Sequence, residues 1–128
     1  MTEVQKETIA RTFIEALQSR DSQRLRSVLT DDVVWSIPGT SHASGEAIGV
    51  DAVVARGEYL GANGVDFVLL HVLYGWKDVG ISLHNTAQRR GCVLDEYLTS
   101  ILRLRGDQIE RIDTYISDVP MLNNFARN

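Results

Sequence analysis

Four strand-like runs fill the second half of this 128-residue chain, and the breaks between them are short. The runs are rich in β-branched and aromatic residues, and they cover Val65–Trp76, Val79–Gln88, Val93–Arg105 and Gln108–Ser117. The breaks are Gly75–Asp78, Arg89–Gly91 and Arg105–Asp107, and each contains a glycine, the residue that tight turns favour. Strands joined in this way pair with their neighbours in antiparallel fashion. The second half of the sequence therefore predicts an antiparallel meander.

The first half of the chain is mainly helical in pattern. Residues 3–19 carry apolar side chains at helical spacing, and Thr2 with Gln5 forms a weak capping box before them. A second helix is expected over 21–29, capped by Asp21. A third is expected from Asp51, as its cap, to about Leu60.

Two short strands are predicted between the second and third helices. The first covers Asp31–Ile37 and ends at the turn signal Pro38-Gly39, and the second covers Glu46–Gly49. The tail, Val119–Asn128, is expected to be a short helix or a coil. Helices followed by a curved antiparallel sheet define an α+β fold, and the length fits a single domain over residues 1–128.

Charge and composition exclude several functional classes. The net charge of −4 argues against a nucleic-acid-binding protein, which needs a basic face. No run approaches the ~20 apolar residues of a membrane span, and the polar start lacks a signal-peptide pattern. A cytoplasmic protein is the expectation. Cys92 is the only cysteine, which excludes an internal disulfide and favours a plain packing role.

Several short segments form a series with a recognisable order and spacing: Asp31–Gly39, Ser44-Gly45, Gly49–Val53 and Gly106–Ile109, with Tyr115 and Asp118. This series resembles SnoaL-like proteins of the nuclear transport factor 2 (NTF2)-like superfamily. The resemblance implies a conical half-barrel with a deep pocket for a small apolar ligand, and a homodimer formed through the outer sheet face. It implies neither a metal nor an organic cofactor. The superfamily includes ketosteroid isomerases, polyketide cyclases, dehydratases, epoxide hydrolases and non-catalytic proteins, so fold alone does not fix function.

Side-chain alternation along the predicted strands separates two sheet faces. A turn at 89–90 places His84 opposite Asp95, and a turn near Gly106 places Thr99 opposite Asp113. One face is then polar and holds His71, Ser82, His84, Asp95, Tyr97, Thr99, Asp113 and Tyr115. The other is more apolar and holds Val68, Leu70, Val72, Val79, Ile81, Leu83, Leu94, Glu96, Leu98, Ser100, Leu102, Ile112, Thr114 and Ile116. We expect the apolar face to line the pocket under the helices.

This assignment places one candidate acid–base pair outside the pocket. His84 and Asp95 fall on the outer face, where a polar cross-strand pair in a dimer interface is the expected role. The predicted dimer face comprises His71, His84, Asp95, Tyr97 and Tyr115. A single β-bulge would exchange the two faces.

The acid–base positions implied by the resemblance are altered in this sequence. Ile37 stands where ketosteroid isomerases carry their catalytic aspartate, and Phe13 where they carry a tyrosine. Ser100 and Thr114 stand at positions of acidic or histidine side chains in the related isomerases and cyclases. These hydroxyls can still orient a ligand by hydrogen bonds, but steroid isomerase chemistry is disfavoured.

Three candidate catalytic residues remain. Glu96 is the one acid on the apolar face, where burial would raise its pKa, although a rim position paired with an arginine is an alternative. Asp118 would lie by the pocket mouth, either as an acid–base group or as a helix cap. His42 lies in the loop after Pro38-Gly39 and is either functional or simply solvated. Asn85 and Thr86 are expected at the solvent end of the sheet.

The predicted ligand pocket consists of apolar walls and the two hydroxyls. Its members are Phe13, Leu17, Trp35, Ile37, Tyr59, Leu98, Ser100, Ile112 and Thr114. The first hypothesis is a cofactor-independent cyclase, isomerase or dehydratase that acts on a small apolar molecule. The second is a non-catalytic ligand-binding or dimeric interaction domain. The volume of the pocket and the ionisable groups inside it separate the two hypotheses.

Overall fold

A computed structural model describes residues 1–127 of the chain, and it opens with two helices. Helix α1 spans Glu3–Ser19, and both hydrogen bonds of the predicted capping box between Thr2 and Gln5 are present. Helix α2 spans Ser22–Ser27, with Asp21 at its N-cap as predicted. It is shorter than the expected 21–29 because Leu29 already pairs with Ile109 in the sheet.

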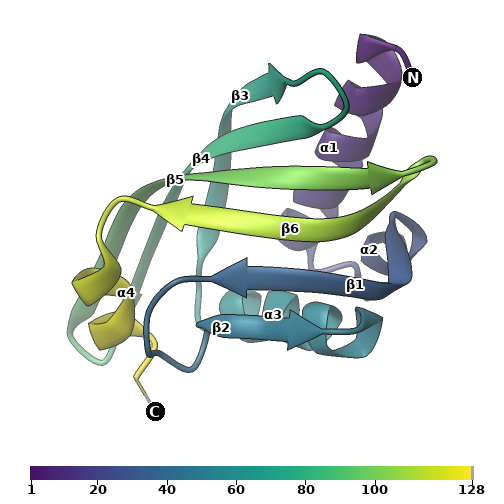
Figure 1. Ribbon diagram of the computed structural model, residues 1–128. Helices are drawn as coiled ribbons and strands as arrows, with labels where there is room; N and C mark the ends of the chain where they lie inside the picture. Colours follow the sequence, from purple (N-terminus) through teal and green to yellow (C-terminus); the bar gives the residue numbers. More distant parts are fainter. Residues whose placement is uncertain (128) are drawn as a thin grey trace.

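Six strands form one mixed sheet that supports the whole molecule (Figure 1). They are β1 (Leu29–Ile37), β2 (Gly45–Ile48), β3 (Asp66–Tyr74), β4 (Val79–Arg89), β5 (Cys92–Arg105) and β6 (Gln108–Ile116). Their order across the sheet is β2-β1-β6-β5-β4-β3. Only β1 and β6 run parallel, and the other neighbours are antiparallel. The predicted α+β class and the mainly antiparallel meander are confirmed.

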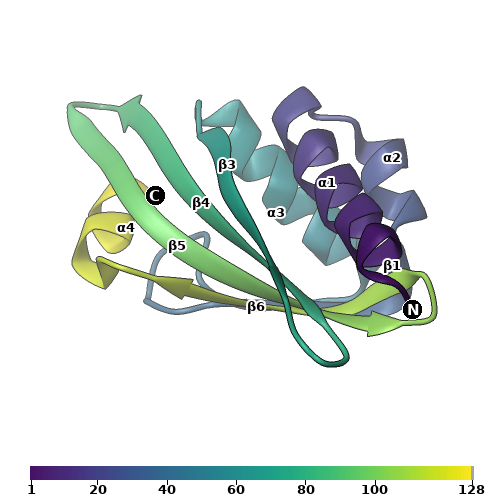
Figure 2. The same cartoon turned by 90° about the horizontal axis from the view of Figure 1, so that it is seen from above.

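The helices cover one face of this sheet (Figure 2). Helix α1 packs on β3 and β4, and α3 (Val50–Ala62) packs on β1 and β2. Helix α4 (Val119–Phe125) contacts β5, beyond the end of β6. The buried core lies between the helical layer and the inner sheet face, where Phe13, Trp35, Ile81, Leu102 and Ile112 are buried. The curved sheet and its helices leave room for a hollow between the two layers.

The predicted pairing of β4, β5 and β6 was wrong by two residues. His84 lies opposite Tyr97 rather than Asp95, and Thr99 lies opposite Tyr115 rather than Asp113. The cause on β4–β5 is the turn, which consists of Arg90 and Gly91, both at positive φ. Two such residues form the tight hairpin turn that matches strand twist. Because alternation has a period of two, a two-residue shift leaves every side chain on its predicted face.

One irregularity does exchange the faces, within β3. The register between β3 and β4 shifts between Leu69 and His71. On the N-terminal side of this bulge Val68 lies opposite His84, so Val68 is on the outer face. Val68 and Leu70 are exposed, whereas Phe67 is buried on the inner face. The prediction that Val68 and Leu70 line the pocket was therefore wrong.

The third helix begins one residue before the predicted cap. Gly49 is the N-cap of α3 with a φ of 93°, and its N–H donates to the carbonyl oxygen of Val33. The positive φ favours glycine, and it lets the chain turn from β2 directly into the helix. Asp51, the predicted cap, lies in the first turn instead and forms an ion pair with Arg26 (2.7 Å).

Within residues 1–127, no helix is both long enough and apolar enough to cross a membrane.

Substituting Gly39, in the loop after β1, tests the close packing of this loop on α4. Gly39 has a φ of 111°, and a Cβ there would lie 2.5 Å from Asn123 Oδ1 and 2.9 Å from Ser44 Oγ. Gly91→Ala is the matched control, because Gly91 also has a positive φ but faces open space. We expect Gly91→Ala to lower the free energy of unfolding by about 1–2 kcal/mol from backbone strain alone. Gly39→Ala should lower it further, and equal losses in urea denaturation would contradict the described packing.

Candidate functional site

A cavity lies between the inner sheet face and the helices. It encloses about 560 Å³ of space between atoms, a volume that includes the open solvent at its mouth. Of the predicted pocket residues, the following line it: Phe13, Leu17, Trp35, Ile37, Leu98, Ser100 and Thr114. These side chains come from α1, β1, β5 and β6, so the cavity is a product of the whole fold.

Two predicted pocket residues lie elsewhere. Ile112 is fully buried in the core, opposite Leu102 on β5, and does not line the cavity. Tyr59 lies on α3 beside Leu60, and it is Leu60 that faces the cavity. The Tyr59 hydroxyl accepts a hydrogen bond from Arg89 (3.0 Å) instead. Neither Tyr59 nor Ile112 therefore lines this cavity.

Other lining residues were not among the nine pocket residues named from the sequence, although Leu83, Leu94 and Ile116 belong to the sheet face that was expected to line the pocket. They are Ala43, Leu60, Val65, Phe67, Leu83, Asn85, Leu94, Ile116 and Leu122. Asn85 is the polar one, and it is buried rather than at the solvent end of the sheet. The inward orientation of Asn85 could have been predicted from the sequence, because Asn85 follows the inward-facing Ile81 and Leu83 at a spacing of two residues on the same strand. Leu122 belongs to α4, whose packing over the cavity had no periodic signal in so short a segment.

The two predicted hydroxyls form a buried chain with Trp35. The indole Nε1–H of Trp35 donates to Thr114 Oγ1 (2.9 Å), and Thr114 Oγ1 lies 2.7 Å from Ser100 Oγ. The bond between the hydroxyls uses one of their two hydrogens. No other side-chain bond of either hydroxyl is present in residues 1–127, so one O–H remains able to donate. This end of the cavity can hold an acceptor oxygen of a ligand.

Glu96 is buried inside the same cavity, with 2% of its surface exposed. One carboxyl oxygen, Oε1, accepts a hydrogen bond from the backbone N–H of Asp118 (2.8 Å). The other, Oε2, is buried without a partner in the described chain. Burial raises the pKa of Glu96 above its ordinary value of 4.5, the N–H of Asp118 partly offsets this, and the Asp118 charge adds to it. Within residues 1–127 no arginine pairs with Glu96. This differs from the alternative considered from the sequence, a rim position paired with an arginine.

The other two candidate catalytic residues do not line the cavity. Asp118 is the N-cap of α4, and its carboxylate accepts from the backbone N–H of Met121 (3.0 Å). It therefore acts on Glu96 through its own backbone N–H and its charge. His42 is exposed on the loop after β1, and its ring lies against that of Tyr59, with centroids 4.6 Å apart. It borders surface hollows outside the cavity.

The residues predicted for the dimer face lie on the outer side of the sheet. His84 Nε2 lies 2.6 Å from Asp95 Oδ1, although the two residues are diagonal rather than opposite. The His84 ring also stacks on Tyr97, with centroids 4.3 Å apart and an interplanar angle of 4°. Tyr97, Tyr115 and His71 are exposed. His84 and Asp95 thus lie on the sheet face opposite to Glu96.

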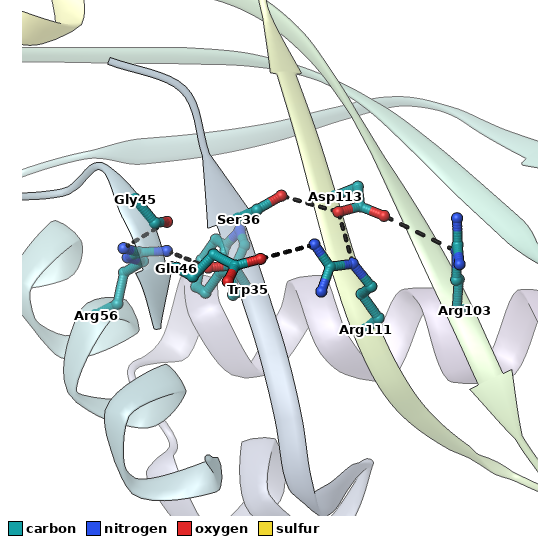
Figure 3. Close-up of polar contacts among 8 residues, drawn as sticks. All are labelled: Trp35, Ser36, Gly45, Glu46, Arg56, Arg103, Arg111 and Asp113. Carbon is teal, nitrogen blue, oxygen red and sulfur yellow. Dashed lines mark hydrogen bonds and ion pairs between the residues drawn. The ribbon is translucent and has the colours of Figure 1, made fainter. Parts of the chain in front are cut away.

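A second polar network occupies the outer face nearer β1 and β2 (Figure 3). Asp113 accepts from Ser36 Oγ (2.9 Å) and from Arg111 Nε (2.9 Å), and Arg111 also donates to Glu46 (3.0 Å). These bonds tie β1, β2 and β6 together. In the same view, Arg56 reaches the carbonyl oxygens of Trp35 and Gly45. Arg56 thereby fixes the backbone at Trp35, whose indole belongs to the cavity.

Within residues 1–127, no three His, Cys, Asp or Glu side chains lie close enough together to hold a metal ion. Cys92 is partly buried, and its Sγ accepts from Asn124 Nδ2 (3.3 Å). Among the residues that line the cavity, the polar groups are Glu96, Asn85 and the Ser100–Thr114–Trp35 chain.

Solved structures place this architecture among known folds. The chain is similar to Bal32a from a soil-derived mobile gene cassette, with 28% identity, a TM-score of 0.90 and coverage of 96% of this chain and 97% of that chain. An NTF2-like protein from Burkholderia xenovorans LB400 is 19% identical, with a TM-score of 0.84 and coverage of 99% of both chains. The fold is therefore that of NTF2-like proteins, as the sequence resemblance indicated.

A ketosteroid isomerase-like protein from Kribbella flavida DSM 17836 shares the fold as well. It is 14% identical to this chain, with a TM-score of 0.75 and coverage of 89% of this chain and 78% of that chain. No protein-family model and no curated protein match the sequence.

Burial of Glu96 predicts a specific dependence of stability on pH. Because its pKa is raised in the folded state, ionisation of Glu96 favours unfolding, and stability is lost as pH rises above about 4.5 through the folded-state pKa. Glu96→Gln should therefore gain free energy of unfolding relative to the wild type as pH rises from 4 to 7.5, measured by urea denaturation. Glu110→Gln, at a surface carboxylate paired with Arg105, controls for the loss of one charge. A difference that is constant or shrinks with pH would contradict the burial of Glu96.

Proposed function

We propose that this protein binds a small, mainly apolar molecule in the cavity and transfers a proton to or from it through Glu96. The observation that carries the proposal is the free carboxyl oxygen of Glu96, which is buried and has no partner in the described chain. An unsatisfied buried acceptor costs about 1–3 kcal/mol. A group held at that cost, inside an apolar cavity, fits a functional role better than a structural one.

The surroundings of Glu96 suit general acid–base chemistry. Burial raises its pKa, which brings the carboxyl closer to the pH at which a cell works and makes it a more effective proton shuttle. The uncommitted hydrogen of the Ser100–Thr114 pair would hold a second oxygen of the substrate, away from the reacting carbon, while Phe13, Leu17 and Leu98 exclude water. This set of groups supports a cofactor-independent isomerase, cyclase or dehydratase. The shared fold of the isomerase-like structure is consistent with that class.

Exchange of substrate hydrogen for solvent deuterium tests the proposed proton transfer. A panel of small apolar ketones is incubated with the protein in D₂O, and exchange at the carbons beside the carbonyl is followed by NMR. We expect at least one ketone to exchange faster with the wild type. Glu96→Gln should slow that exchange by roughly 10²–10⁴-fold while binding persists, since it retains shape but not the titratable proton.

Glu110→Gln is the control for this experiment, because Glu110 lies outside the cavity. It should leave exchange unchanged. Undiminished exchange in Glu96→Gln would remove Glu96 from its proposed role. Ligand binding without exchange of any ketone would instead favour the second hypothesis, a non-catalytic binding domain.

We also propose that two copies associate through the outer sheet face. This face carries exposed Tyr97, Tyr115, Val68 and Leu70, and exposed apolar side chains gathered on one face favour association. Tyr97→Asp should convert a dimer to a monomer in light scattering coupled to size exclusion. Val4→Asp, at an exposed apolar residue of α1, should not. A wild-type protein that is monomeric at tens of micromolar would contradict this proposal.

A further inference from the structure

Asn85 carries a side-chain amide that is buried and makes no hydrogen bond within residues 1–127. Its residue is 8% exposed, it lines the cavity, and its Oδ1 has no partner there. An amide offers two N–H donors and an acceptor oxygen, and leaving the buried Oδ1 without a donor is unfavourable. A leucine would pack in such a position without this penalty. The amide is therefore available to a molecule that enters the cavity.

Asn85 and Glu96 stand directly opposite each other on β4 and β5. Side chains in such a pair have Cβ atoms roughly 4.5–5.5 Å apart. The free Oε2 of Glu96 and the free amide of Asn85 therefore serve the same small region of the cavity. A ligand hydroxyl fits both groups at once, because it can accept from the amide N–H and share its own hydrogen with the carboxyl.

The Ser100–Thr114 hydroxyls lie at a different place along the cavity. Ser100 follows Glu96 by four residues on β5, which separates their Cα atoms by roughly 13 Å. Between them the wall is apolar, since Leu98 and its neighbour Ile116 face the same space. A carbonyl and the carbon next to it are too short to touch both polar ends.

We infer that the ligand is an elongated, mainly apolar molecule with an acceptor oxygen at the Ser100–Thr114 end and a hydroxyl or enol at the Asn85–Glu96 end. Asn85 is then a positioning residue that holds the reacting end of the ligand against Glu96. The inference rests on the proposed function, and it adds the length and the two polar groups of the ligand. It also locates the reacting centre at the Glu96 end, away from the hydroxyl pair.

Two pairs of aromatic ketones test the required length. The long pair is 4-acetyl-4′-hydroxybiphenyl and 4-acetylbiphenyl, and the short pair is 4-hydroxyacetophenone and acetophenone. Within each pair only the hydroxyl differs, and affinity is measured by calorimetry or ligand-observed NMR. We expect the hydroxyl to raise affinity about tenfold or more in the long pair, because it reaches a desolvated carboxyl and amide. In the short pair it should have less than about a twofold effect, since one ring does not span the two ends.

Variants at the two ends should separate the two contacts. Asn85→Leu should remove most of the hydroxyl's effect in the long pair and leave the affinity of 4-acetylbiphenyl nearly unchanged. Ser100→Ala should weaken both biphenyls by a similar factor, since both carry the carbonyl. Gln88→Leu, an amide on the same strand outside the cavity, should change neither affinity. Thermal melting checks each fold, and Asn85→Ala replaces Asn85→Leu if the larger side chain prevents folding.

The outcomes distinguish this inference from the function on which it rests. Biphenyl ketones that bind without any gain from the hydroxyl would overturn the inference and leave the apolar pocket intact. A gain that survives Asn85→Leu and Asn85→Ala would remove Asn85 from its positioning role. Failure of all four compounds to bind the wild type would count against both the ligand pocket and its proposed length.

Discussion

Burial of the Glu96 carboxyl against the inner face of a curved sheet is the interaction on which the account of this site depends. Strand alternation places Leu94, Leu98 and Leu102 on the same face as Glu96, and the helices exclude water above them. Within residues 1–127 the carboxyl receives one hydrogen bond, from the backbone N–H of Asp118 just before α4. Its electrostatics and its position therefore both follow from the sheet that carries it.

Much of the fold was predictable because its local signals agree with one another. The capping box at Thr2, the Asp21 cap and the glycine-containing breaks each fixed an element or a hairpin. Which face each β5 side chain occupies was also predictable, because an error of two residues in register does not change the face. The bulge after Leu69 was not predictable, since no glycine or proline marks it. It turned Val68 and Leu70 outward.

The site was predictable in part, and the physical reason differs between residues. Glu96 stood out as one acid in an apolar series, and Ser100 and Thr114 followed from the same alternation. Tyr59 does not line the cavity as predicted, because helical periodicity alone does not decide which of two neighbouring apolar residues faces inward. Leu60 occupies that position instead. The buried Oδ1 of Asn85, which has no partner in the described chain, became meaningful only when its surroundings were known. Hydrogen-bond partners across strands are a property of tertiary structure, and a linear pattern does not contain them.

A site-resolved NMR titration of the Glu96 carboxyl carbon in the ligand-free protein tests the central claim most directly. The account predicts a pKa for Glu96 above the ordinary value of 4.5, because burial disfavours the ionised form more than the Asp118 N–H stabilises it. A measured pKa for Glu96 at or below 4.5 would show a solvated carboxylate. That result would contradict both the buried site and the acid–base role built on it.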